Sequence, residues 1–222
     1  MSRLLEGPRL RSSTNGTPRP PLPPTGGGDG PDSEPSPRRS LVDNATLATL
    51  AFIGAEVMFF GGLVSAFWVL RLAAPVWPPP LQPRLPVGVT ALNTLVLLAS
   101  SVAVAAAGRA LGAGRRRASV RRLGAAAALG VLFLGTQGYE WMRLIQFGLT
   151  VGSGAYGATF YTLVGAHAAH VAGALGWLTT VLALLARGRL GGRRPAALRA
   201  CALYWHFVVA LWPILWASVY LL

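Results

Sequence analysis

Five ionisable side chains lie inside long apolar stretches, and they are the residues of this sequence best suited to chemistry. They are Glu56, Glu140, His167, His170 and His206. Carboxyl and imidazole groups take up and release protons, and both can ligate metals. Because a charged group inside a bilayer is costly unless it is neutralised or paired, such residues often mark functional positions.

Glu56 lies deep in the first apolar stretch, about 18 Å from its start at Asn44 if the stretch is helical. Two interpretations stay open. In the first, a neutral carboxyl is hydrogen-bonded to a facing His, Ser or backbone carbonyl and ties two helices together. In the second, Glu56 handles protons. Glu140, between Tyr139 and Trp141, lies closer to the predicted outer interface and is kept as a further polar candidate.

His167 and His170 are three residues apart, so on one helix they form a polar stripe about one turn long. They cannot bind opposite faces of one haem, and a bis-histidine site would need His206 plus one of the pair. A carboxylate-bridged metal site would need a Glu-x-x-His repeat, which the sequence lacks. Interhelical hydrogen bonds are therefore favoured over a bound haem or metal.

The composition indicates which elements position these residues. The 222 residues are 53% hydrophobic and only 12% charged, which is typical of a membrane protein. The net charge of +13 comes from arginines that fall in short clusters between apolar spans, so nucleic-acid binding is not favoured. The single cysteine, Cys201, excludes an internal disulfide.

The chain divides into a tail and a helical domain. Residues 1–42 are rich in proline, glycine and arginine and predict a disordered tail, whereas residues 43–222 predict an all-α bundle of five transmembrane helices. The proline-rich segment 73–86 cannot be helical. Asp43 and Asn44 are expected as the helix N-cap, and the expected spans are 47–71, 87–109, 123–141, 157–186 and 198–222.

Arginines predict the orientation of the helices. From the tail onward the connections carry six, two, six, one and five arginines, so high and low counts alternate. Under the positive-inside rule the N-terminus is cytoplasmic and the C-terminus lies outside. Aromatic residues at the predicted outer ends indicate an interfacial belt: Trp68, Trp77, Trp141, Trp212, Trp216 and Tyr220.

Several stretches in order along the chain carry a family resemblance. They are GAEVMFFGGLVSAFW around Glu56, LNTLVLLASSV from Leu92, GTQGYEW with Glu140, YGATFYTLVGAHAAHVAGAL and YWHFVVALWPILW. Together they resemble cytochrome c oxidase subunit III over nearly everything from residue 45 to the end. The chain is similar to the five-helix bacterial form, whereas longer members have seven helices.

The resemblance implies a helical subunit that has no catalytic centre and carries no haem or copper. It would pack against the catalytic subunit I of a haem-copper oxidase of the aa3 or a related type, with haem and copper in the partner subunits. There it would stabilise the complex and support proton uptake. Glu56 falls on the family's buried glutamate, and the three histidines fall on its recurrent ones. Val209 replaces an acid of the family's YWHFVD pattern, so that acid's role is not carried over.

We therefore expect a multi-pass subunit of a respiratory oxidase in the bacterial cytoplasmic membrane, in contact with lipids and other oxidase subunits. One alternative is the related accessory subunit of a nitric oxide reductase. Others are a small proton or solute transporter, although the sequence lacks inverted repeats, and an independent haem-binding membrane protein.

Overall fold

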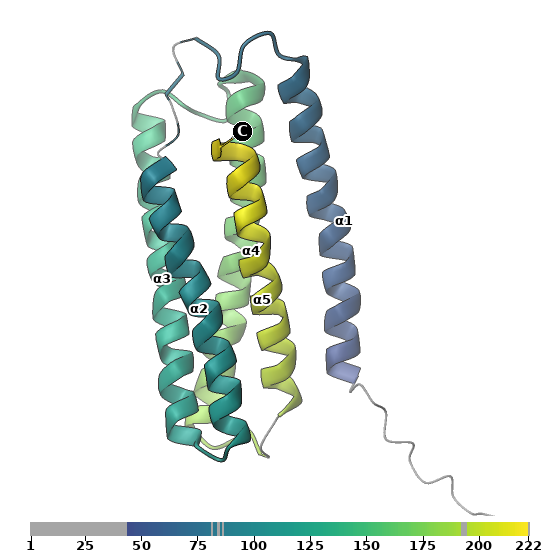
Figure 1. Cartoon of the computed structure of the whole chain (residues 1–222), viewed down its shortest axis with the longest axis vertical. Helices are drawn as coiled ribbons and strands as arrows, with labels where there is room; N and C mark the ends of the chain where they lie inside the picture. The colour runs from purple at the N-terminus through teal and green to yellow at the C-terminus, as the bar shows by residue number, and fades with distance from the viewer. Residues whose placement is uncertain (1–43, 81, 84, 86, 192–194, 222) are drawn as a thin grey trace, which may run out of the picture. The chain divides into compact units, whose positions relative to one another are not determined.

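The structure is a computed structural model that describes residues 44–80, 82–83, 85, 87–191 and 195–221 (Figure 1). Five long α-helices account for most of these residues, and no strand occurs among them. The elements are α1 (Asn44–Ala73), α2 (Val87–Gly112), α3 (Arg116–Gln146), α4 (Gly154–Ala186), α5 (Ala196–Trp216) and a terminal π-helix, η1 (Ala217–Leu221).

Each of the five helices is long and apolar enough to cross a membrane. The prediction of an all-α membrane protein with five spans is therefore confirmed. The predicted tail, residues 1–42, lies outside the described residues, and the orientation of the termini stays a prediction. The described residues of the proline-rich segment between α1 and α2 are not helical, as expected.

The largest difference from the predicted boundaries is in α3, which begins at Arg116 rather than at residue 123. Hydropathy detects only the apolar part of a helix, whereas backbone hydrogen bonds continue into the polar residues beyond it. At about 1.5 Å per residue, the 31 residues of α3 measure about 46 Å, which exceeds the ~30 Å hydrocarbon thickness of a bilayer. Its arginine-rich first turns therefore extend past the apolar layer.

A tight turn joins α2 and α3 and makes them antiparallel neighbours. Gly114 has a φ of +75°, in the left-handed region that favours glycine. Its N–H donates to the carbonyl of Leu111 at 2.9 Å, and the N–H of Arg115 donates to that of Ala110 at 2.9 Å. These bonds satisfy carbonyls at the end of α2 and reverse the chain in three residues.

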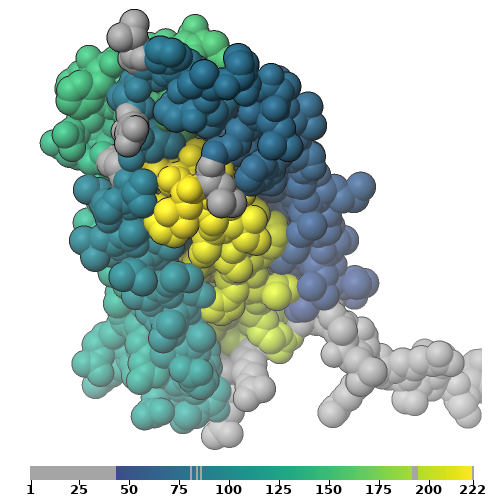
Figure 2. All heavy atoms as spheres, turned by 45° about the horizontal axis from the view of Figure 1, so that its top comes forward, coloured from purple at the N-terminus to yellow at the C-terminus, as the bar shows by residue number. Residues whose placement is uncertain are grey.

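The position of α5 among the other helices brings distant parts of the sequence together. α5 packs against α1, α2 and α4, and α3 packs against α2 and α4. Figure 2 shows the surface of α5, in yellow and yellow-green, between those of α1 and α2. α1 packs mainly on α5 and α4 and is the least buried of the spans, with only 11% of its apolar window inside the bundle.

Trp212 departs from the expected interfacial belt. Its side chain is fully buried, and its indole N–H donates to Thr94 Oγ1 on α2 at 2.8 Å. The indole can lie inside the bundle because its one polar group has this partner. The belt assignment of Trp212 was therefore wrong.

Gly130 on α3 lies against the side chains of Trp205 on α5 and Leu175 on α4. A Cβ at this position would lie 2.8 Å from Cη2 of Trp205 and 3.2 Å from Cδ1 of Leu175, and Trp205 is itself only 1% exposed. We expect Gly130→Ala to lower the free energy of unfolding by about 1–3 kcal/mol, the usual cost of overpacking a core. Thermal unfolding in detergent measures this.

Gly124 on the same helix provides the matched control, because nothing lies within 4 Å of a Cβ built there. Gly124→Ala should be neutral or slightly stabilising, since alanine is the better helix former. Equal melting temperatures for the two variants would show that the α3–α5 contact tolerates an extra methyl group.

Candidate functional site

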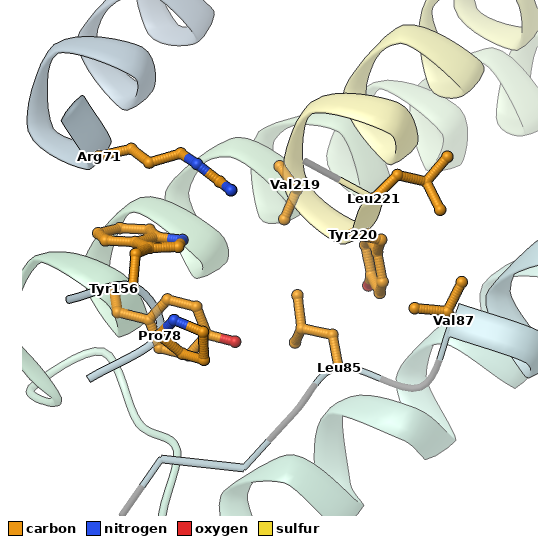
Figure 3. Close-up of a pocket in the computed structure, with 9 residues that line it drawn as sticks. Arg71, Pro78, Leu85, Val87, Tyr156, Val219, Tyr220 and Leu221 are labelled. Carbon is orange, nitrogen blue, oxygen red and sulfur yellow. The ribbon is translucent and has the colours of Figure 1, made fainter. Parts of the chain in front are cut away.

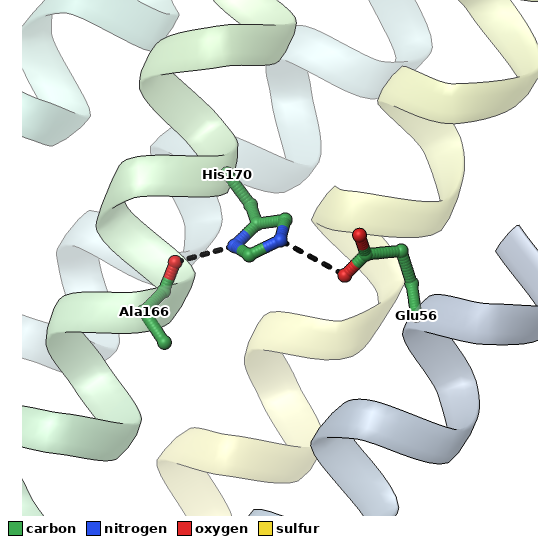
Figure 4. Close-up of polar contacts among 3 residues, drawn as sticks. All are labelled: Glu56, Ala166 and His170. Carbon is green, nitrogen blue, oxygen red and sulfur yellow. Dashed lines mark hydrogen bonds and ion pairs between the residues drawn. The ribbon is translucent and has the colours of Figure 1, made fainter. Parts of the chain in front are cut away.

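Glu56 and His170 meet between α1 and α4. His170 Nε2 lies 2.9 Å from Glu56 Oε2, and His170 Nδ1 lies 2.6 Å from the carbonyl oxygen of Ala166 one turn earlier (Figure 4). A carbonyl oxygen can only accept, so Nδ1 carries a hydrogen and donates it. This bond fixes the orientation of the imidazole, so that Nε2 faces the carboxylate.

The facing atoms of Glu56 and His170 are close enough for a proton to lie on either of them. With the proton on Nε2, the pair is an imidazolium and a carboxylate; with the proton on Glu56, both groups are neutral and Nε2 accepts. In either state the two atoms face each other at 2.9 Å, a distance short enough for an ion pair, while Glu56 Oε2 has no regular hydrogen bond among the described residues. The site can therefore hold a proton inside the membrane without leaving an uncompensated charge.

The surroundings of the pair are aromatic on one side and open on the other. The ring centroids of Phe59 and Phe60 lie 6.0 and 5.1 Å from that of His170. The side chain of His170 is 23% exposed and that of Glu56 is 11% exposed. Both groups thus remain reachable from the surface of the bundle.

His167 has a different environment, so the two histidines do not form the single polar stripe expected from their spacing. Its ring is fully buried and stacks on Trp212, with 4.9 Å between centroids and 24° between planes. Phe60 and Phe133 present their edges to it at 6.4 and 6.3 Å. Within the described residues, neither ring nitrogen has a hydrogen-bond partner.

His206 belongs to a polar contact between α5 and α2. Its Nδ1 lies 2.5 Å from Ser101 Oγ. The indole of the preceding residue, Trp205, donates to Ser100 Oγ at 3.1 Å, and that of Trp212, six residues further on, donates to Thr94 Oγ1 at 2.8 Å. These contacts tie α2 to α5 along their length.

The polar face of α2 was not singled out from the sequence, although a signal exists. Asn93, Thr94, Ser100 and Ser101 are polar residues in an otherwise apolar run, and spacings of seven or eight residues place them on one helix face. Asn93 Nδ2 also donates to the carbonyl of Phe133 on α3 at 3.1 Å. The periodicity predicts a packed face but does not identify the partners.

Glu140 is 4% exposed on α3, and its ion pair is with Arg143 of the same helix, at 3.6 Å. Among the described residues, no three His, Cys, Asp or Glu side chains are grouped as metal ligands could be.

A small cavity opens at the end of the bundle where α1 ends and α2 and α4 begin. It has a volume of about 260 Å³, and Figure 3 shows Arg71 reaching toward it from α1. Trp77, Tyr156 and Tyr220 contribute aromatic walls. Arg71 also packs over the ring of Trp68 at 5.6 Å, and no acidic side chain lines the cavity.

The fold and these contacts define the class: an all-α protein of five membrane spans with an acid–imidazole contact between two of them. Residues 39–222 match the family described as cytochrome c oxidase subunit III. The chain belongs to the cytochrome c oxidase subunit III family, and the family resemblance expected from the sequence is confirmed.

Curated relatives from bacteria and from an animal support the same family. The probable cytochrome c oxidase subunit 3 of Mycobacterium leprae is 36% identical over 183 residues, covering 79% of this chain and 86% of the relative. The subunit 3 of Synechocystis sp. is 32% identical over 184 residues, which cover 81% of this chain and 76% of the relative. The subunit 3 of Ornithorhynchus anatinus is 34% identical over 177 residues, which cover 77% of this chain and 67% of the relative.

Family membership makes the chain a multi-pass membrane protein and an accessory subunit that belongs with other oxidase subunits. It does not favour the nitric oxide reductase or transporter alternatives. Val209, which replaces the family's acid, is 2% exposed and forms part of the apolar core.

Proposed function

We propose that this subunit stabilises the catalytic haem-copper subunit of a bacterial terminal oxidase and supports its proton uptake. The Glu56–His170 contact carries the proposal. It is an acid–base pair within one hydrogen-bond distance inside a spanning bundle, and part of both side chains reaches the bundle surface. A proton that enters or leaves the pair can therefore be exchanged with a group outside this chain.

The remaining polar contacts support the stabilising role. Three described contacts join polar groups of α2 and α5: the part-buried Ser101–His206 contact and the two buried indole hydrogen bonds of Trp205 and Trp212. Interhelical hydrogen bonds in membranes contribute about 0.6 kcal/mol on average. These contacts hold α2 and α5 together as part of a preformed surface on which a larger partner can dock. Haem and copper would be bound by that partner.

Purification of the tagged chain from its native membranes in mild detergent tests the proposal. We expect a larger haem- and copper-containing subunit to co-purify and the complex to oxidise a reduced electron donor with oxygen. The chain expressed alone should show no Soret band. A haem spectrum in the isolated chain, or a co-purified complex that reduces nitric oxide instead of oxygen, would contradict the assignment.

A further inference from the structure

Two arginines in the first turns of α3 have structural roles. Arg116 Nε donates to the carbonyl of Leu185 at 2.9 Å and Arg116 Nη2 to that of Ala186 at 2.8 Å, so Arg116 caps the end of α4. Arg122 Nη1 donates to the carbonyl of Ala106 on α2 at 2.7 Å. These arginines join the ends of three helices.

Arg117 and Arg121 have no such role. Both are exposed, and neither side chain has a hydrogen bond or ion pair with another described residue. Their spacing of four residues places them on the same face of α3. Together with Arg116, Val120 and Ala186 they line a cavity of about 660 Å³, which we call the α3–α4 groove.

The groove combines an arginine rim with an apolar floor. Val120 and Ala186 supply the apolar part, and three guanidinium groups surround it. It lies where the apolar part of α4 ends and in the arginine-rich turns of α3 that extend beyond the hydrocarbon layer. This is the depth at which the headgroups of phospholipids lie.

The chain offers little negative charge to neutralise this rim. After Asp43 its only acidic residues are Glu56 and Glu140, and both contact other groups inside the spans. Residues 1–42 contain six arginines against four acids, so their net charge is also positive. The rim therefore favours an anionic group from outside the chain.

We propose that the α3–α4 groove binds an anionic phospholipid. The guanidinium groups of Arg117 and Arg121 hold the headgroup phosphate, because arginine matches phosphate with paired N–H donors. Val120 and Ala186 contact the glycerol and the first acyl carbons. The predicted cytoplasmic placement of this end matches the leaflet surface to which basic residues are attracted.

The test uses the full chain purified in mild detergent, with bound lipid counted by native mass spectrometry. The probes are phosphatidylglycerol, phosphatidylcholine and inorganic phosphate. Each arginine near an anionic lipid contributes about fivefold to the binding affinity. The double variant that combines Arg117→Gln and Arg121→Gln should therefore bind phosphatidylglycerol about 25-fold more weakly. Circular dichroism checks that the variant keeps its helical content.

The matched control removes the same charge from the same end of the bundle. Arg115 and Arg189 are exposed and do not line the groove. We expect Arg115→Gln with Arg189→Gln to bind phosphatidylglycerol as the unaltered chain does. If both double variants lose phosphatidylglycerol binding equally, the proposed site in the α3–α4 groove is wrong, because general surface charge would then account for binding.

Two further outcomes are measured on the unaltered chain and do not depend on a variant folding. Phosphatidylcholine bound as tightly as phosphatidylglycerol would overturn the requirement for negative charge. Inorganic phosphate that displaces phosphatidylglycerol at equal concentration would identify a free anion, rather than a lipid, as the ligand. Weak phosphatidylcholine binding and no displacement by phosphate are the results we expect.

Discussion

Replacing Glu56 by glutamine is expected to leave the oxidase complex assembled, with unchanged haem content, while lowering its turnover several-fold. Glutamine has nearly the same size and can still donate to His170 Nε2, so the α1–α4 contact survives. It cannot exchange a proton with the imidazole. Oxygen consumption by the purified complex, normalised to haem, measures the effect.

Ser101→Ala is the matched control, because it removes an interhelical contact to a histidine without removing a carboxyl group. The control should affect stability by about 0.6–1.7 kcal/mol and leave initial turnover unchanged. If Glu56→Gln and Ser101→Ala give the same initial turnover, Glu56 serves only in packing and the proton-uptake proposal is wrong.

His167→Ala is expected to lower the free energy of unfolding of this subunit by about 3 kcal/mol. The ring is fully buried against Trp212, Phe60 and Phe133, and its removal leaves a cavity in the middle of the bundle. Thermal unfolding of the purified chain in detergent, followed by circular dichroism, measures the loss.

His167→Phe should instead be neutral or stabilising. Both ring nitrogens lack a partner among the described residues, and an apolar ring of similar shape removes that cost while keeping the stacking. A His167→Phe variant as unstable as His167→Ala would show that the nitrogens make a contact in the folded chain, and our account of this residue would then fail.

The spans could be predicted from the sequence because a helix in lipid needs a long apolar run, whatever its neighbours are. The start of α3 could not be predicted in this way, because Arg116 to Arg122 continue the helix outside the apolar layer. The arginines that cap α4 and contact α2 looked like simple topology determinants. Their hydrogen bonds depend on which helix ends lie side by side, and one sequence does not contain that information.

The partner of Glu56 was predicted only as a facing polar group. Residues three apart on a helix point about 60° apart. The packing of α4 therefore directs His170 toward α1 and turns His167 into the core. Hydrophobicity could not distinguish them, because α4 is apolar on nearly all sides. Trp212 was assigned to the interface for a similar reason, since its partner Thr94 comes from a helix far away in the sequence.

A double-mutant cycle on oxygen consumption tests most directly whether Glu56 and His170 work as one unit. The variants are Glu56→Gln, His170→Phe and the two combined, with turnover of the purified complex as the readout. If the two groups act through one shared proton, as proposed, the double variant should be no slower than the slower single variant. Effects that multiply, so that the double variant is slowed by the product of the two single losses, would contradict a shared role for the pair.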